Sequence, residues 1–309
     1  MSEKRKNMKL LKPKIDVVFQ SLFSKKNEKI TKAFAEAILD EKVRKITIND
    51  DKELFRERPE DKLGILDLEL DINDSEKVDV EIQLVDRSNI QERLLFYFSK
   101  LYYNEVKKGD DYKKAKRVVM VAILDYDLDL TKEIKNMETI WQLREKNARD
   151  LVLTDKVEIA IIELSKVRAE YEKNKKNKKA QWALFIDDPN TKEVEEIMKE
   201  NEDIEEAIVT VHKMTEDEKM RRLADLREKA IMDEKAIRRK GYEDGKSKGL
   251  AEGRTQGREE GREEGREEGR EEGRSESQRN IAKKLRNMGM PIKDIEQITE
   301  LSKEEIEKL

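Results

Sequence analysis

The segment from residue 64 to residue 84 alternates apolar and mostly acidic side chains on both sides of a short polar turn. Its apolar positions are Leu66, Leu68, Leu70 and Ile72 before the turn and Val78, Val80, Ile82 and Leu84 after it. The positions between them are Asp67, Glu69, Asp71, Asp79, Glu81 and Gln83. Because neighbouring side chains of a strand point to opposite faces, this period of two predicts a β-hairpin with one apolar and one acidic face.

The alternation also limits how the two strands can pair. Both apolar sets share one face only if the numbers of two paired residues have an even sum, so Asp67 lies opposite Glu81 or opposite Gln83. Directly opposed Cβ atoms are about 4.5–5.5 Å apart. Either register therefore gathers several carboxylates near one point.

Two interpretations of this acidic face stay open. Carboxylates this close repel one another, and a divalent cation such as Mg²⁺, which binds carboxylate and carbonyl oxygens, relieves the repulsion. Alternatively, the acids line the solvated outer face that antiparallel sheets often have. The segment from Asp51 to Asp86 contains 13 acids and 5 bases, an excess that favours the cation site over an ordinary mixed surface.

The order of Asp67, Glu81 and Gln83 resembles the metal site of the PD-(D/E)XK nucleases. It fits the recombination-promoting nuclease (transposase) family of that superfamily, in which Gln stands at the Lys position. Further blocks resemble this family in the same order: KPKIDVVFQSLF (12–23), KLGILD (62–67), VEIQ (80–83), ERLLFYFSKLY (92–102), LTDKVEIAIIEL (153–164) and the glycine-spaced tail. The resemblance implies an α/β (α+β) fold of the restriction-endonuclease type, with a mixed sheet flanked by helices and a helical C-terminal region.

The same resemblance assigns roles to single residues. Asp67 and Glu81, with the backbone carbonyl of Ile82, would hold Mg²⁺ or another divalent cation, and Gln83 would complete the catalytic set. Gln83 is neutral where most of the superfamily has Lys, which leaves open the group that orients the attacking water. Accessory candidates on the flanking helices are Asp16, Arg93 and Tyr97.

Two accessory candidates also have simpler interpretations. Asp16 opens an amphipathic helix, where the helix dipole favours a carboxylate. Tyr97 shares its helical neighbourhood with Leu94, Phe98 and Leu101, which is typical of core packing.

Composition excludes several other kinds of site. Without Cys the chain has no disulfide, thiolate zinc site or Cys nucleophile, which fits a cytoplasmic protein. His212 is its only histidine, so a histidine-based triad or metal cluster is excluded. The longest apolar run, Val118 to Leu124, is far shorter than the ~20 residues of a membrane helix, and no signal peptide or membrane contact is expected.

Three segments are strongly basic. Residues 1–32 contain 10 bases and 3 acids, residues 107–117 contain 6 and 2, and residues 166–179 contain 7 and 2. Such patches can neutralise the phosphates of double-stranded DNA, the expected partner, or they can simply keep a highly charged surface soluble.

Periodicity predicts helices at 15–23, 29–39 and 88–109, strands at 43–49, 65–72, 78–85, 118–124, 140–143 and 157–164, and a helical half from residue 182. Capping boxes at Ser88, Thr215 and Ser302 predict three helix starts. We expect a nuclease-like domain over 1–180, a helical extension over 181–240, a repeat spacer over 241–274 and short helices over 275–309.

Nine glycines at a strict period of four, from Gly241 to Gly273, set the tail apart. In a helix they would cost roughly 9 kcal/mol relative to Ala, whereas the Glu–Arg pairs return about 0.2–0.5 kcal/mol each. The repeat is therefore expected to be a marginal helix or a flexible spacer. Residues 241–247 place three residues between glycines where a P-loop needs four, so no nucleotide cofactor is expected.

The preferred hypothesis is a Mg²⁺-dependent DNA endonuclease that promotes recombination by hydrolysing phosphodiester bonds. The alternative is a catalytically weak or inactive DNA-binding or regulatory protein that retains the nuclease fold. A third hypothesis is a structural interaction protein organised by the tail. The short C-terminal helices are candidates for forming a homo-oligomer.

Overall fold

The computed structural model describes residues 8–49 and 67–309, which form two compact units, Met1–Lys235 and Ala236–Leu309. Predictions that fall on residues 1–7 and 50–66 lie outside the described part of the chain. They include the position of Leu66 and all of the KLGILD block except Asp67. None of the described helices is long and apolar enough to cross a membrane.

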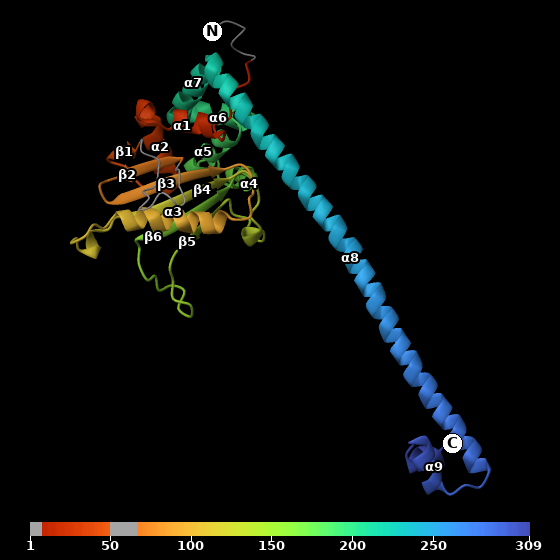
Figure 1. Ribbon diagram of the computed structural model, residues 1–309. Coiled ribbons are helices and arrows are strands. Elements are labelled where there is room, and N and C mark those ends of the chain that lie inside the picture. The colour runs from red at the N-terminus through yellow and green to blue at the C-terminus, as the bar shows by residue number, and fades with distance from the viewer. Residues whose placement is uncertain (1–7, 50–66) are drawn as a thin grey trace. The chain divides into compact units, whose positions relative to one another are not determined.

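A six-stranded mixed sheet forms the centre of the first unit (Figure 1). The central pairs β3–β4 and β4–β6 are parallel, whereas the pairs nearer the edges are antiparallel. The order across the sheet is β1 (Ile46–Asn49), β2 (Leu68–Ile72), β3 (Glu76–Gln83), β4 (Arg117–Leu124), β6 (Val157–Glu163) and β5 (Glu138–Trp141). The predicted mixed sheet with flanking helices is confirmed.

The predicted hairpin is β2 and β3. Leu68 pairs with Val80 and Glu69 with Asp79, so paired residue numbers sum to 148. This is one of the two registers that the sequence left open, and it brings Asp67, just before β2, to the level of Glu81.

The apolar face of the hairpin packs against helices on one side of the sheet (Figure 1). These are α1 (Asp16–Leu22), α2 (Glu28–Leu39) and α5 (Lys178–Asp187). Aromatic rings join them: the centroids of Phe23 and Phe34 are 4.3 Å apart, and those of Phe34 and Trp182 are 5.7 Å apart. Residues after 180 thus complete the same core, and the boundary expected at residue 180 falls inside the first unit.

The acidic face lies beneath α3 (Ile90–Asn104), whose Leu94 and Phe98 pack with Met120 of β4. Asp79 and Glu81 are therefore 0% and 1% exposed. The interpretation of this row as a solvated outer face is wrong. The continuous apolar run of β4 needs cover on both sides, and α3 supplies the second cover.

Further helices complete the first unit. They are α4 (Leu164–Lys173), α6 (Lys192–Glu200), α7 (Glu202–Glu216) and the first turns of α8 (Glu218–Asn287), with 3-10 helices η2 (Lys25–Asn27), η3 (Tyr112–Lys114) and η4 (Asp129–Thr131).

Of the three predicted capping boxes, one is confirmed and two are wrong. Ser302 forms the box at the start of α10 (Lys303–Glu307). Ser88 instead has φ of +57°, and Asn89 precedes α3 without a side-chain cap. Thr215 lies inside α7, where its hydroxyl donates to a main-chain carbonyl of the preceding turn, and Asp217 caps α8.

In the second unit, the glycine repeat is part of the continuous helix α8, and every residue from 241 to 274 is exposed. Of the two expected forms of the repeat, a marginal helix and a flexible spacer, the structure has a helix. At the end of α8, α9 (Ile292–Thr299) and α10 fold back onto it around a small core of Ala282, Ile295, Leu301 and Ile306.

The repeat glycines offer a direct test of this helix. A Cβ atom added at any of them meets nothing within 4 Å. Changing Gly257, Gly261, Gly265 and Gly269 to Ala should therefore stabilise the helix by about 1 kcal/mol per site. Circular dichroism during heating should show helix that persists to a higher temperature than in the parent.

Gly289→Ala is the matched control, because Gly289 has φ of +81°, where an added side chain is strained. It should destabilise the C-terminal helices. A four-alanine variant that loses helix at a lower temperature than the parent would contradict the helical repeat.

Candidate active site

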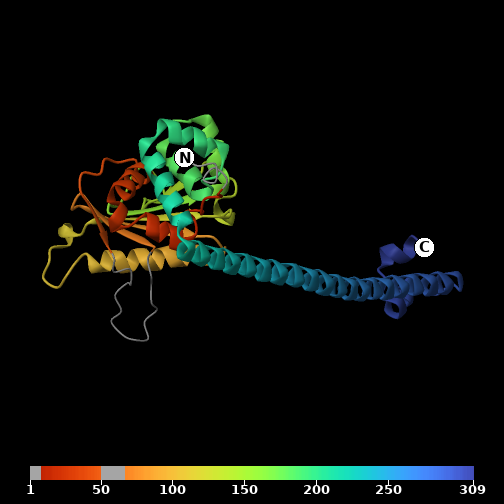
Figure 2. The same cartoon turned by 90° about the horizontal axis from the view of Figure 1, so that it is seen from above.

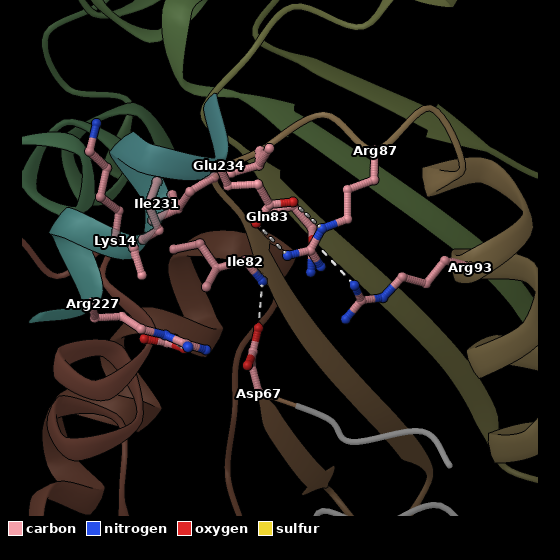
Figure 3. Close-up of a pocket in the computed structure, with 13 residues that line it drawn as sticks. Lys14, Asp67, Ile82, Gln83, Arg87, Arg93, Arg227, Ile231 and Glu234 are labelled. Atoms are coloured by element: carbon pink, nitrogen blue, oxygen red, sulfur yellow. Dashed lines mark hydrogen bonds and ion pairs between the residues drawn. The ribbon is translucent and has the colours of Figure 1, made fainter. Parts of the chain in front are cut away.

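Asp67 is held at the open end of the β2–β3 hairpin. Its Oδ2 accepts a hydrogen bond from the Ile82 main-chain N–H at 2.9 Å (Figure 3). Its Oδ1 accepts one from Gln20 Nε2 of α1 at 3.2 Å. The N–H and C=O of one residue in an extended strand leave the same edge. The Ile82 carbonyl therefore points to the strand edge on which Asp67 lies.

Glu81 lies on β3, at the level of Asp67 in the hairpin. Its Oε2 accepts hydrogen bonds from Arg93 Nη2 at 3.1 Å and from Gln83 Nε2 at 3.3 Å. Its Oε1 is buried and has no hydrogen-bond partner among the residues that the structure describes. A buried carboxylate oxygen without a partner is energetically costly, so this atom is suited to binding a cation.

The electrostatics of the three neighbouring carboxyls are consistent with this geometry. Burial and the negative charge of Asp67 raise the pKa of Glu81 to about 8, against the opposing effect of Arg93. Burial also raises the pKa of Asp67, and burial with the charge of Glu81 raises the pKa of Asp79 well above its usual range. At neutral pH these carboxyls do not all carry charge unless a positive group joins them.

The other acids of the hairpin are already paired. Lys77 Nζ lies 2.8 Å from Glu69 Oε1, and Lys116 Nζ lies 2.6 Å from Asp71 Oδ1. Asn49 also donates to both carboxylates. Lysines therefore pair Glu69 and Asp71, whereas the negative charge of Asp67, Asp79 and Glu81 is incompletely balanced: Glu81 Oε1 and both carboxylate oxygens of Asp79 are buried without a hydrogen-bond partner among the described residues.

The donor set at that end suits a hard divalent cation. Two carboxylates and a main-chain carbonyl are oxygen ligands of the kind that Mg²⁺ takes, and Mg²⁺ usually completes its shell with water and substrate phosphate. No group of three or more Asp, Glu, His or Cys side chains with metal-binding geometry occurs in the described part of the chain. Protein groups would therefore supply only part of the coordination shell.

Arg93 brings positive charge to the position where Gln83 is neutral. Its Nη1 donates to Gln83 Oε1 at 3.3 Å, and its guanidinium lies 5.1 Å from the ring centroid of Tyr97. Tyr97 is 7% exposed and packs in the core beneath α3. Core packing, one of the two interpretations of Tyr97 made from the sequence, is thus observed, and its ring also contacts Arg93, which lines the cleft. An accessory role for Tyr97 stays a prediction.

Asp16 lies at the start of α1 and also lines the cleft, and its accessory role stays a prediction. It opens α1, where its Oδ1 accepts a hydrogen bond from the Val17 N–H, and its Oδ2 accepts one from Arg227 Nε at 2.6 Å. Its negative charge contributes to the raised pKa of Asp67. Asp16 and Asp67 therefore line the same cleft and are close enough for their charges to interact.

A cleft of about 190 Å³ joins these groups. Figure 3 shows its lining, which comes from the start of α1 and the residues just before it, the hairpin, the segment between β3 and α3, α3 itself and residues 227–234 of α8. The lining residues are Lys14, Asp16, Asp67, Ile82, Gln83, Leu84, Val85, Arg87, Arg93, Arg227, Ala230, Ile231 and Glu234.

Helix α8 contributes residues to the cleft that sequence reasoning missed. Arg227 pairs with Asp16, and Glu234 accepts two hydrogen bonds from Arg87, each at 2.9 Å. Lys235 Nζ lies 2.8 Å from Asp125 Oδ2. The sequence predicted a helical extension over residues 181–240 but not the face of the domain on which it docks.

The raised pKa of Glu81 predicts how stability depends on pH. Between its usual value near 4.5 and about 8, the folded state holds more protons at Glu81 than the unfolded chain does. The contribution of these protons to the free energy of unfolding is fully present below about pH 4.5 and is lost as the pH rises through about 8. The raised pKa values of Asp67 and Asp79 change the stability in the same direction.

The free energy of unfolding of the metal-free protein, measured with urea in chelator, should therefore fall by a few kcal/mol between about pH 5 and about pH 8. Glu81→Gln should flatten this dependence, because the amide keeps the shape without the titration. A stability that rises with pH, equally in both proteins, would show that the site is not strained by charge.

Comparison with known proteins agrees with this geometry. A family model described as PD-(D/E)XK nuclease family transposase matches residues 13–241. No curated protein and no solved structure matches the chain. The family match covers well over half of the 309 residues, including the hairpin, α3 and the α8 residues of the cleft. The chain therefore belongs to the PD-(D/E)XK nuclease family of transposases.

Proposed function

We propose that this protein is a Mg²⁺-dependent DNA endonuclease that promotes recombination by hydrolysing phosphodiester bonds in double-stranded DNA. The observation that carries the proposal is the pair Asp67 and Glu81 at the open end of the hairpin, where Glu81 Oε1 is buried without a partner among the described residues. Burial and the charge of Asp67 raise the pKa of Glu81, and perturbed pKa values of this kind are common at functional sites.

Asp67, Glu81 and the Ile82 carbonyl would hold the cation, which supplies Lewis-acid activation of the phosphate and of a bound water. Glu81 would hold the cation as a carboxylate, so a proton held by its acid form would pass to solvent. Asp67 is already oriented for this role by the Ile82 N–H, and burial beneath α3 limits the access of bulk water to Glu81. The protein thus supplies a fixed set of oxygen ligands.

Arg93 has a second role in the proposal. Its guanidinium is within hydrogen-bonding distance of both Glu81 and Gln83, at 3.1 Å and 3.3 Å. Arg93 therefore supplies from α3 the positive charge that Lys supplies in most of the superfamily. Gln83 would orient a water molecule through its amide, which accepts and donates hydrogen bonds but takes up no proton at neutral pH.

The other cations of the cleft suit DNA binding. Arg87 and Arg227 line it together with Arg93. One guanidinium group can donate two parallel hydrogen bonds to two oxygens of a phosphate. A phosphate entering the cleft would compete with Glu234 and Asp16 for these two arginines. Binding should therefore weaken with salt, because each phosphate contact releases a condensed counterion.

A catalytically weak or inactive DNA-binding or regulatory protein is the second candidate. Gln83 in place of Lys favours it, because a neutral amide supplies no charge to the transition state. The ion pairs that α8 forms at the cleft also fit a closed site. Both candidates share the fold and the cleft, so metal-dependent cleavage of DNA separates them.

Four variants test the assignment of the ligands. Asp67→Asn and Glu81→Gln keep the shape of each side chain but remove a ligand charge, and each should slow plasmid relaxation at least about a hundredfold. Both metal-free variants should be as stable as the parent or more stable, because like-charge repulsion is relieved. Gln83→Ala should be intermediate, since Arg93 keeps the positive charge in place.

Glu69→Gln is the matched control: Glu69 lies on the same face but is paired with Lys77. It should retain most of the activity. If Asp67→Asn cleaves like the parent while Glu69→Gln does not, the assignment of ligands is wrong. Full activity of the parent in chelator would reject the metal mechanism.

A further inference from the structure

A second surface lies at the far end of α3 from the cleft. We call it the tyrosine groove, a hollow of about 920 Å³ along residues 102–112. Figures 1 and 2 show this part of the chain as a loop that leaves the end of α3 and carries the short helix η3. The lining residues are Tyr102, Tyr103, Asn104, Val106, Lys107, Lys108, Gly109, Asp110 and Tyr112.

Aromatic rings dominate this groove. Tyr103 and Tyr112 are 62% and 83% exposed, and Tyr102 stacks on Phe98 with ring centroids 6.0 Å apart and an interplanar angle of 13°. All three tyrosines line one hollow, so their rings together form a candidate interaction surface. The groove therefore presents flat apolar surfaces, one of them fixed by the core of α3.

The loop that carries Tyr112 is ordered by its own hydrogen bonds. The Lys107 N–H donates to Asp110 Oδ2 at 3.0 Å, and the Lys113 N–H donates to Asp111 Oδ1 at 2.9 Å. Gly109 has φ of +95°, which permits the turn between them. Both local acids thus hold the backbone, and the loop is partly preorganised for binding.

Two exposed lysines, Lys107 and Lys108, line the groove, and two more, Lys113 and Lys114, follow Tyr112 directly in the sequence and are exposed as well. None forms an ion pair with a residue in the described ranges. The neighbouring bases differ, because Lys116 pairs with Asp71 and Arg117 with Glu76 and Glu158. The basic segment 107–117 is therefore divided into two structural cations and four cations that can bind phosphate.

We propose that the tyrosine groove binds an unpaired stretch of DNA adjacent to the cleft. Exposed rings with flanking lysines are the combination that binds single strands, because bases stack on the rings while the lysines neutralise the phosphates. Duplex DNA hides the faces of its bases in its own stack, so only unpaired bases can use the tyrosines. The inference rests on the proposed function in taking DNA as the ligand.

The position of the groove fits this ligand. Arg93 lines the cleft and Tyr103 the groove, ten residues apart on one helix, which is about 15 Å at 1.5 Å per residue. This equals about four steps of DNA at 3.4 Å each. One DNA molecule can therefore reach both sites, duplex at the cleft and unpaired beyond it.

The test is binding of labelled DNA to the full chain in chelator, which prevents metal-dependent cleavage, followed by fluorescence anisotropy. A duplex with a single-stranded tail should bind the parent more tightly than the same duplex with blunt ends. Tyr112→Ala should weaken binding of the tailed duplex by about tenfold and leave the blunt duplex unchanged. Tyr112→Phe should bind like the parent, because the ring remains.

The lysines give an independent readout. Lys107→Gln/Lys108→Gln should lower the slope of log affinity against log salt by about 1.4 for the tailed duplex, at about 0.7 per phosphate contact. The matched control is Lys192→Gln/Lys199→Gln on α6, which removes the same charge from an exposed helix outside the three basic segments and should leave the slope unchanged.

Equal binding of tailed and blunt duplexes by the parent, or equal binding of the tailed duplex by Tyr112→Ala and the parent, would overturn the inference. Either result would leave the proposed function standing if plasmid cleavage depends on Asp67 and Mg²⁺. Conversely, tail-dependent binding that is lost in Tyr112→Ala supports the groove even if no cleavage is seen.

Discussion

The buried row of carboxylates on the hairpin is the constraint on which the rest of the first unit depends. The apolar face of the hairpin packs β2 and β3 against α1, α2 and α5, so the acidic face of the hairpin must face α3. Unpaired buried charges on this face would destabilise the fold, and the two ends of the hairpin limit that destabilisation in different ways. Lysines neutralise Glu69 and Asp71, whereas Glu81 relies on Arg93 and a raised pKa.

The cleft is assembled from parts of the chain that are distant in sequence. Asp16 comes from α1, Asp67 and Glu81 from the hairpin, Arg93 from α3 and Arg227 from α8. The ion pairs between α8 and the domain join residues more than 100 positions apart, and they lie beside the candidate ligands. The part of α8 that belongs to the first unit thus also forms one wall of the cleft, through Arg227, Ile231 and Glu234.

Local pattern predicted much of this site. The period of two predicted the hairpin, two registers and a shared face for its acids, and the family resemblance of Asp67, Glu81 and Gln83 named the ligand candidates. Pattern alone could not decide whether α3 would cover that face, because burial is set by packing between distant segments. Ser88 and Thr215 matched the capping pattern, but a positive φ and burial inside α7 override it. The α8 residues were missed because helical periodicity carries no information about docking.

The central claim is that Asp67 and Glu81 form a cation site that is strained without its cation. Calorimetric titration of Mg²⁺ into the metal-free chain, in buffers with different heats of ionisation, measures the protons released per cation bound. With the pKa of Glu81 near 8, binding at neutral pH should release about one proton, and Glu81→Gln should lose this release and bind more weakly. Binding without proton release, undiminished in Glu81→Gln, would contradict the account.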